Sequence, residues 1–420
     1  MDFLRVWVND KPVGRLTRLR NGATFVYDEG VAEGDAVSLS MPVRAASYDS
    51  PNTMLPTFDT NVPEGALLER IRKVLSKARD ERVSTFDVLE VVGGNQIGRV
   101  RVLPDGQAPE RRDKLHDITE FLNRSASDEL IGEIVERYAL RSGVSGAMPK
   151  VLLDDVANLQ EDYQRATIQT RDYILKFDDA DFPGLSLNEF HCLEAARKAG
   201  NEVANARLNA DGRMLAVERF DESLTGERFG FEDFCSMNGK VSSEKYTGSI
   251  ESALFRTCSD FAGKGVQGGV NLERLYRQVL TSVALRNGDA HLKNFGLLFT
   301  DAADGSARLS PAYDIVTTTV YIKNDLMALN LNGTKRWSDP KALERLGARA
   351  GLKPSMARTI MAEVADGIEA QIPIMHRDIT LHGHPDLADR MAAEWASGIK
   401  SLGCAPSEPE MDIGAPEPAP

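Results

Sequence analysis

The chain has 420 residues, 42% hydrophobic and 27% charged, a globular composition that is too long for a single hydrophobic core. Its formal net charge of −13 argues against a protein that binds nucleic acid through a basic surface of its own. The four cysteines form no CxxC pair, which argues against a zinc ribbon or a disulfide framework. No secretory signal or membrane-length apolar run is visible, so we expect a cytoplasmic protein with no membrane association.

The first hundred residues predict a β-rich module that also contains helices. Residues 3–8 are strand-like, and a turn at residues 9–12 should fold the strand back. Apolar residues repeat at helical spacing after Pro63. Ser84 and Asp87 resemble a capping pair that begins a second helix.

This second helix should end at Gly93-Gly94, and residues 97–103 should return as a strand. A Gly/Ser loop at residues 141–150 then precedes a strand at residues 173–177. Asn188 is expected to cap a helix that runs to Ala199 and stops at Gly200, before a strand at residues 214–217.

The second half predicts mainly helices. Residues 272–283 form an amphipathic pattern that should end at Asn287-Gly288. Strands at residues 295–299 and 310–313 are expected to flank a turn at residues 301–305. The residues from 405 onward are rich in Pro and Glu and should be disordered. These patterns suggest four segments, namely 1–108, 109–225, 226–403 and a tail at 404–420.

Asp289 and Asn294 lie five residues apart in a predicted loop, and Asp314 follows the next strand-like pair. Phosphoryl transfer needs this set of groups. One carboxylate orients the attacking hydroxyl or accepts its proton, while an amide oxygen and a second carboxylate bind Mg²⁺. Protein kinases space the catalytic Asp and the metal-binding Asn in the same way. Each residue alone could equally be a turn or cap residue, but the three together favour a kinase.

Upstream residues fit the same chemistry. Lys176 lies inside an apolar strand, where a buried cation needs a partner such as Glu189 in the first turn of the next predicted helix. Lys176 could instead face solvent on an edge strand, and Glu189 could simply favour its helix N-terminus. The Gly/Ser loop offers backbone N–H groups and Lys150 to a phosphate, although a plain connector is equally consistent with its sequence.

Two further groups are candidates for nucleotide contacts. Glu218, Arg219 and Phe220 fall where a kinase joins its lobes, so their backbone could meet adenine. Asp221 could reach the ribose, and the alternative is a strand end with a surface salt bridge. His291 has no metal-ligand partner at a useful spacing. We interpret it as a group that orients the site or contacts a phosphate, and a structural role fits nearly as well.

These residues make the chain resemble HipA-type serine/threonine kinases, the toxins of bacterial toxin–antitoxin pairs, from about Met1 to Gly403. The segment 58–65 also looks like a motif of the family's N-terminal region. The resemblance implies an α/β (α+β) fold, with an N-terminal β-rich module on a two-lobed protein-kinase-like body whose C-terminal lobe is mainly helical. The matching motifs are residues 145–150, 173–177, 187–189, 216–221, 287–295 and 311–314.

The resemblance also implies roles. Asp289 would be the catalytic base, Asn294 and Asp314 the Mg²⁺ ligands, and Lys176 a phosphate ligand. The ATP-binding set would be Ser145, Gly146, Ala147, Lys150, Lys176, Glu189, Glu218, Arg219, Phe220, Asp221, His291, Lys293 and Asn294.

Family members are neutralised by a HipB-like helix-turn-helix antitoxin dimer that binds operator DNA, so DNA contact would come mainly through that partner. Their known targets are translation components, typically aminoacyl-tRNA synthetases, whose phosphorylation arrests growth. The family also switches itself off by phosphorylating a loop serine, which would be Ser145 or its neighbour Ser142 here. Met148 replaces the usual glutamine of this loop, which removes a polar contact.

Two other functions fit parts of the sequence. Small-molecule kinases of the aminoglycoside or choline kinase type share the run from Gly288 to Asn294, but they leave the N-terminal module unexplained. A kinase-like protein without activity could sequester an antitoxin or act as a co-repressor, and loss of nucleotide binding would distinguish it.

Overall fold

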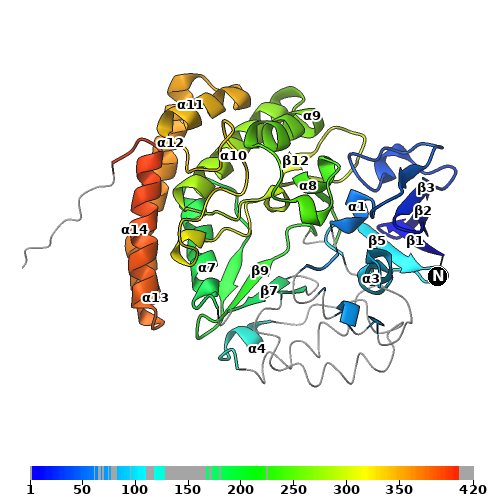
Figure 1. Ribbon diagram of the computed structural model, residues 1–420, viewed down its shortest axis with the longest axis horizontal. Helices are drawn as coiled ribbons and strands as arrows, with labels where there is room; N and C mark the ends of the chain where they lie inside the picture. Colours follow the sequence, from blue (N-terminus) through cyan, green and yellow to red (C-terminus); the bar gives the residue numbers. More distant parts are fainter. Residues whose placement is uncertain are drawn as a thin grey trace, which may run out of the picture.

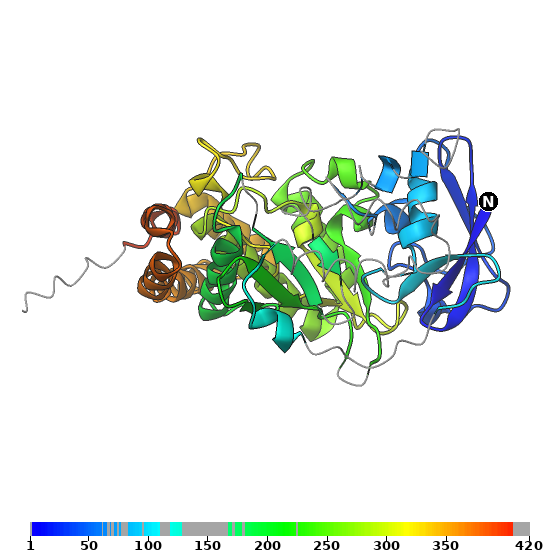
Figure 2. The ribbon, with the colours of Figure 1, turned by 90° about the horizontal axis from the view of Figure 1, so that it is seen from below.

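The structure is a computed structural model, and strands dominate its N-terminal part while helices dominate its C-terminal part (Figure 1). The two views place the first strands at one end of the molecule and the last two helices at the other (Figure 2). The described residues are 2–60, 62–64, 68, 71–73, 75–76, 83–94, 96–109, 118–127, 167–169, 173–178, 181–223 and 226–405.

The N-terminal module is built on a five-stranded antiparallel sheet with the order β4-β3-β2-β1-β5. Burial alternates along β1, where Leu4, Val6 and Val8 face the core, as a half-buried strand requires. The predicted return after residue 8 is confirmed, with Asn9 in the left-handed region at φ 52°. The strands are β1 Phe3–Val8, β2 Lys11–Arg18, β3 Ala23–Tyr27, β4 Tyr48–Ser50 and β5 Val100–Pro104.

Short helices cover this sheet. The capping pair is confirmed, because Ser84 and Asp87 form a reciprocal capping box at the start of α3, Thr85–Val92. The described residues between 68 and 76 are helical, and two of the apolar positions expected there, Ile71 and Leu75, are buried. The last strand begins at Val100, later than the sequence predicted. The other helices of the module are η1 Glu33–Asp35 and α1 Pro56–Asp59.

A second, four-stranded sheet has the antiparallel order β6-β7-β9-β8, and α7 packs against it. The predicted cap of α7 is wrong. The helix begins three residues before Asn188, after Gly184 at φ 74°, because the Asn188 side chain is bonded to the backbone of Thr317 and cannot cap. The elements are α4 Thr119–Leu122, β6 Thr167–Gln169, β7 Tyr173–Phe177, α7 Leu185–Lys198, β8 Ala206–Leu208 and β9 Met214–Glu218.

The C-terminal part is organised around the long helix α10, Gly265–Ala284, which packs against α12, Pro354–Glu369, and α14, Pro385–Ser401. A Cβ at Gly398 would collide with the Ala284 backbone, so glycine permits the close approach of α14 to α10. The remaining helices are α8 Phe234–Met237, η4 Ser242–Glu244, η5 Ile250–Arg256, α9 Thr257–Ala262, η6 Leu292–Asn294, η7 Thr318–Val320, α11 Pro340–Gly347, η8 Ala348–Ala350 and α13 Ile372–Leu381.

A three-stranded sheet, β10-β11-β12, lies beside these helices. The helix α10 ends at Ala284, three residues earlier than predicted. The strand predicted at residues 310–313 is replaced by β12 just before it, although Ala312 forms a parallel bridge with Val203. The strands are β10 Gly230–Asp233, β11 Gly296–Phe299 and β12 Arg308–Leu309. In the part of the chain that the structure describes, no helix is both long and apolar enough to cross a membrane.

The N-terminal module is joined to the rest of the chain by buried polar contacts. The Glu232 carboxylate of β10 accepts hydrogen bonds from the hydroxyls of Ser38 and Ser40 and from the Leu39 amide, at 2.7 to 2.9 Å. The Arg99 guanidinium donates to the carbonyls of Gly34 and Ala36 within the module and to that of Thr300 outside it.

Candidate active site

The predicted catalytic residues lie in a loop that leaves the C-terminal end of α10. Arg286 adopts a left-handed conformation at φ 55°, which turns the chain out of the helix. A Cβ at Gly288 would collide with Asp325, so this position requires glycine. The Gly288 amide donates to the Thr318 hydroxyl at 2.8 Å, and this bond fixes the loop just before Asp289.

The segment after β12 brings Asp314 to Asn294 of this loop, although 20 residues separate the two. The Asn294 amide group donates to the Asp314 carboxylate at 2.9 Å and to its backbone carbonyl at 3.2 Å. Asp314 has the unusual φ of 57°, a conformation that these two bonds help to hold. The neighbouring Tyr313 hydroxyl donates to the Lys293 carbonyl at 2.7 Å, so the two segments are joined twice.

Lys176 is shared between two carboxylates. Its ammonium lies 2.7 Å from Glu189 and 2.5 Å from Asp314, so β7, α7 and the loop after β12 converge on one charge. Burial alone would lower the pKa of Lys176, but the two carboxylates raise it, so the side chain stays charged. Glu189 lies in the second turn of α7, because the helix begins earlier than predicted.

The two carboxylates differ in their electrostatics. The charge of Lys176 lowers the pKa of Asp314 to about 2, so Asp314 is ionised at every physiological pH. Burial raises the pKa of Glu189, whose side chain is only 5% exposed, and the nearby charge of Asp314 adds to this effect. The Asp314 side chain is 42% exposed, which leaves it accessible to a ligand.

The pair of Asn294 and Asp314 fits a magnesium ion. Mg²⁺ prefers oxygen ligands, usually one or two from the protein with water and phosphate completing the shell. The Asn294 carbonyl oxygen is buried and accepts no hydrogen bond from the described residues. It lies on the same amide group that touches the Asp314 carboxylate, so an unpartnered acceptor and an ionised oxygen are held side by side. Together they form a reasonable ligand pair.

Asp289, the predicted base, accepts a hydrogen bond from the Tyr246 hydroxyl at 2.7 Å. His291 packs the edge of its ring against Tyr246, with the ring centroids 5.2 Å apart. Burial lowers the pKa of His291, whereas the negative charges of Asp289 and Asp314 act to raise it. The His291 backbone links the two groups, because its amide donates to the Asp289 carbonyl at 2.7 Å and its carbonyl accepts from the Asn294 amide at 3.0 Å.

Lys293 is directed toward the N-terminal module. Its ammonium lies 2.5 Å from the Glu64 carboxylate and 2.9 Å from the Thr60 carbonyl. The other Glu64 oxygen accepts from Lys245 at 2.6 Å. The module therefore contacts the catalytic loop directly, and Glu64 and Thr60 engage the Lys293 ammonium.

The predicted adenine segment continues from β9. Arg219 and Asp221 form a buried ion pair at 2.6 Å, and the Gly98 amide donates to the same Asp221 oxygen. Both oxygens of Asp221 are thus engaged by protein groups, which leaves the predicted ribose contact without support from this arrangement. The Phe220 ring packs against Tyr313 at 5.4 Å, and the Glu218 amide bonds to the Asn205 carbonyl.

The remaining predictions lie outside the described residues. They comprise the phosphate loop and both candidate autophosphorylation sites, namely Ser142, Ser145, Gly146, Ala147 and Lys150. The predicted disordered tail from residue 406 onward lies outside them as well.

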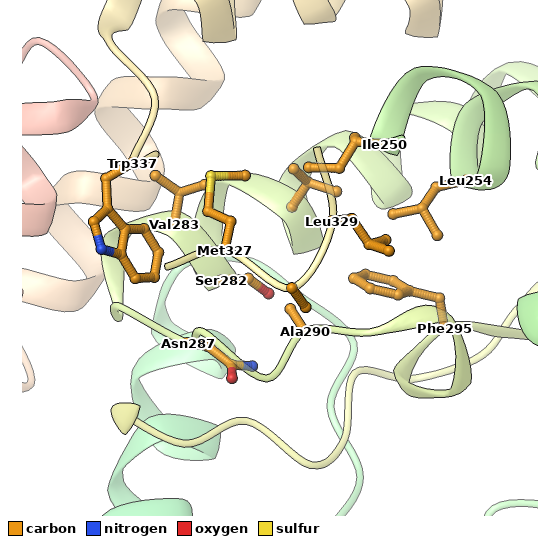
Figure 3. Close-up of a pocket in the computed structure, with 12 residues that line it drawn as sticks. Ile250, Leu254, Ser282, Val283, Asn287, Ala290, Phe295, Met327, Leu329 and Trp337 are labelled. Carbon is orange, nitrogen blue, oxygen red and sulfur yellow. The ribbon is translucent and has the colours of Figure 1, made fainter. Parts of the chain in front are cut away.

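A small apolar cavity lies behind the catalytic loop. It is lined by Asn287, Ala290 and Phe295 together with helical side chains and Trp337 (Figure 3). Its volume of about 20 Å³ has room for about one water molecule. None of the three predicted catalytic residues lines it, so it is separate from the site.

Three groups near the site could not have been found from sequence spacing. Tyr246 and Glu64 approach the catalytic loop from segments far away in the chain. Thr317, held by Asn188 of α7, fixes the segment that follows Asp314. The only sequence signal for the contact with Thr317 was Asn188 itself, a polar residue among apolar residues of its helix.

The chain matches known proteins over nearly its whole length. Two Sinorhizobium fredii proteins, named "Putative kinase Y4mE" and "Putative kinase Y4dM", are 28% and 26% identical to it over 90% and 87% of this chain. The matches cover 88% and 90% of those proteins.

A solved structure of Shewanella oneidensis HipA, in a complex with HipB and operator DNA, has the same fold. It aligns with a TM-score of 0.65 at 17% identity, covering 95% of this chain and 97% of that one. The family model of the HipA N-terminal domain matches residues 4–103, and that of the HipA-like C-terminal domain matches residues 142–372. Because the second match covers more than half of the sequence, the chain belongs to the HipA family.

Proposed function

We propose that the chain is a HipA-type toxin kinase that transfers the γ-phosphoryl group of ATP to a serine or threonine hydroxyl of a protein. The observation that carries this proposal is the convergence of Lys176, Asn294 and Asp314. Three chain segments supply these residues, yet they share one network, as phosphate and metal ligands of a kinase must. Membership of the HipA family supports the same reaction.

In this mechanism Asp289 orients the acceptor hydroxyl and receives its proton. The acceptor oxygen forms a bond to the γ-phosphorus, the bond from that phosphorus to the bridging oxygen breaks, and ADP leaves. Lys176, held by Glu189, would bind the α- and β-phosphates. Asn294 and Asp314 would hold Mg²⁺, which supplies positive charge to neutralise the phosphates.

The Gly/Ser loop and the backbone of Glu218, Arg219 and Phe220 would complete the ATP site, with His291 and Lys293 close to the nucleotide. The loop serines Ser145 and Ser142 would be the sites of an inactivating autophosphorylation. The acceptor would be a translation component such as an aminoacyl-tRNA synthetase, so that its phosphorylation arrests growth. The reaction would take place in the bacterial cytoplasm, where ATP and this substrate are found.

A HipB-like helix-turn-helix dimer would neutralise the toxin. The Shewanella structure contains HipA together with HipB and operator DNA. The net charge of −13 supports a DNA contact that comes mainly through the partner, because the phosphate backbone attracts cations. Tight binding of operator DNA by the isolated chain in a mobility-shift assay would refute this part of the proposal.

The decisive experiment incubates the purified chain with Mg²⁺ and [γ-³²P]ATP, alone and with a bacterial lysate. Asp289→Asn preserves the shape of the side chain but removes the base, so labelling should fall by about 10²- to 10³-fold. Asp304→Asn, in an exposed turn, is the matched control and should label normally.

Label on a lysate protein identifies the target, and mass spectrometry of the chain itself locates any loop phosphate. If neither the unmutated chain nor Asp289→Asn gives any labelled protein, while ATP still stabilises the fold, a small-molecule kinase would be favoured. Absence of both label and ATP binding would favour the inactive co-repressor. A loop without phosphate in an otherwise active kinase would refute the autophosphorylation alone.

A further inference from the structure

The position in front of the proposed base is occupied by a hydroxyl from the protein itself. Within the described chain, the Asp289 carboxylate accepts one side-chain hydrogen bond, which the Tyr246 hydroxyl donates at 2.7 Å. A general base must be within about 2.6 to 3.2 Å of the group whose proton it takes. The Tyr246 hydroxyl, bonded to one oxygen of the Asp289 carboxylate, therefore lies within the distance that an acceptor hydroxyl must reach.

The backbone around Tyr246 is held firmly. The Leu292 amide of the catalytic loop donates to the Lys245 carbonyl at 3.1 Å, and the Lys335 ammonium donates to the Tyr246 carbonyl at 3.2 Å. Lys245 is also paired with Glu64 of the N-terminal module at 2.6 Å. These contacts keep residue 246 next to Asp289 whatever its side chain does.

The Tyr246 side chain can rotate away from Asp289. Tyr246 is 42% exposed, and its ring contacts His291 edge to face, with the Lys245 ammonium 5.3 Å from the ring centroid. Rotation about its side-chain bonds would move the hydroxyl into solvent without breaking the backbone bonds. Exposed side chains make such rotations within nanoseconds, so the displacement presents no kinetic obstacle.

The hydroxyl also remains a donor. Burial raises the pKa of Tyr246, and the hydrogen bond to Asp289 and the charges of Glu64 and Asp314 raise it further. The phenol is therefore protonated at neutral pH and makes the same kind of bond as a serine or threonine hydroxyl. An acceptor that arrives must exchange one hydrogen bond to the carboxylate for another of similar strength.

We propose that Tyr246 is a displaceable plug of the acceptor site, which covers Asp289 until a protein hydroxyl replaces it. This inference rests on the proposed function, because it assumes that Asp289 is the base. The plug keeps water away from the base while no protein acceptor is bound. It adds the cost of its displacement to the binding of every acceptor.

The test measures ADP release from Mg-ATP by the full-length chain without a protein acceptor, so that water is the acceptor. Tyr246→Phe keeps the ring against His291 but removes the hydroxyl, and the rate should rise about fivefold, with the KM for ATP unchanged. Tyr48→Phe removes a tyrosine hydroxyl from the N-terminal module and should change nothing. The double variant with Asp289→Asn should lose the gain.

The outcomes separate this inference from the function on which it rests. A rate that is unchanged or lower in Tyr246→Phe, with Asp289-dependent turnover intact in the parent chain, would overturn the plug and leave the kinase standing. A lower kcat in particular would assign Tyr246 to positioning the base. If neither chain releases ADP although the parent chain labels protein in the [γ-³²P]ATP assay, the plug alone fails. If neither chain releases ADP and the parent labels no protein although ATP binds, the kinase proposal fails and the plug fails with it.

Discussion

At the scale of single residues, the site depends on one cation that neutralises two carboxylates. Lys176 contacts both Glu189 and Asp314, and its side chain is 23% exposed. Glu189 is almost completely buried, so it needs the lysine more than Asp314 does. Without the lysine, the two carboxylates would repel each other and the phosphates of ATP as well.

We therefore expect Lys176→Met to lower kcat/KM for ATP in the labelling assay by about 10²- to 10³-fold, since a charge that faces the phosphates is lost. Lys11→Met is a matched control, because Lys11 is 67% exposed and pairs with Asp35 on the surface. The control should keep its activity and lose less than about 1 kcal/mol of unfolding free energy. A Lys176→Met enzyme with normal kcat/KM would rule out the phosphate role.

The same residues show what a sequence can predict about a site. Lys176, Asn294 and Asp314 were identifiable because each lies at a characteristic place, inside an apolar strand or at a fixed spacing from Asp289. Tyr246 was not, since its contact with Asp289 depends on the path of a separate loop. Asp221 was a candidate ribose ligand with a salt bridge as the alternative, and the structure pairs it with Arg219.

At the scale of elements, the ends of helices decide where the sequence patterns succeed. The capping box of α3 is purely local, and the sequence predicted it correctly. The predicted start of α7 was wrong because Asn188 is a typical capping residue, but its side chain bonds to Thr317, 129 residues away. Local propensity cannot reveal a partner that only the tertiary fold brings close.

The cap of α3 should make stability depend on pH. Asp87 accepts from the Ser84 amide at 2.8 Å and from Arg18 at 2.6 Å. Burial acts to raise the pKa of Asp87, but the hydrogen bonds from Arg18 and Ser84 outweigh it and lower the pKa to about 2. Because the folded pKa is depressed, the stabilisation is complete above about pH 4 and is lost as the pH falls toward 2.

Asp87→Asn should therefore cost about 2 kcal/mol of unfolding free energy at pH 7 and much less near pH 2. Urea denaturation followed by circular dichroism across this range measures the difference between the two chains. The low-pH end is an internal control, because the folded parent carboxyl is itself losing its charge near pH 2. A difference that does not change with pH would show that Asp87 acts by shape alone.

At the scale of the whole molecule, the N-terminal module is built into the catalytic part. Its Glu64 reaches Lys293 of the catalytic loop, while Asp59 accepts from the Ser242 amide near Tyr246 at 2.7 Å. Sequence patterns predicted the module as a unit, but its docking surface includes polar groups from distant segments. A small-molecule kinase would have no need for this contact with the catalytic loop.

A further link is Glu232, which is 3% exposed and accepts bonds from Ser38, Leu39, Ser40 and Ser236. Burial raises its pKa, although these donors oppose the shift. Glu232→Ala would leave buried donors without an acceptor and should cost about 3 kcal/mol of unfolding free energy. It should also separate the unfolding of the module from that of the helical part.

Differential scanning calorimetry measures both effects. We expect one cooperative transition in the parent chain, and in Glu232→Ala a lower-melting transition for the module ahead of that for the helical part. Glu202→Ala is the matched control, because Glu202 is 45% exposed and pairs with Arg274 and Arg308 on the surface. An unsplit transition at the parent temperature would mean that the apolar contacts of the module suffice. A split transition would show that this buried carboxylate couples the module to the part of the chain that carries the catalytic loop.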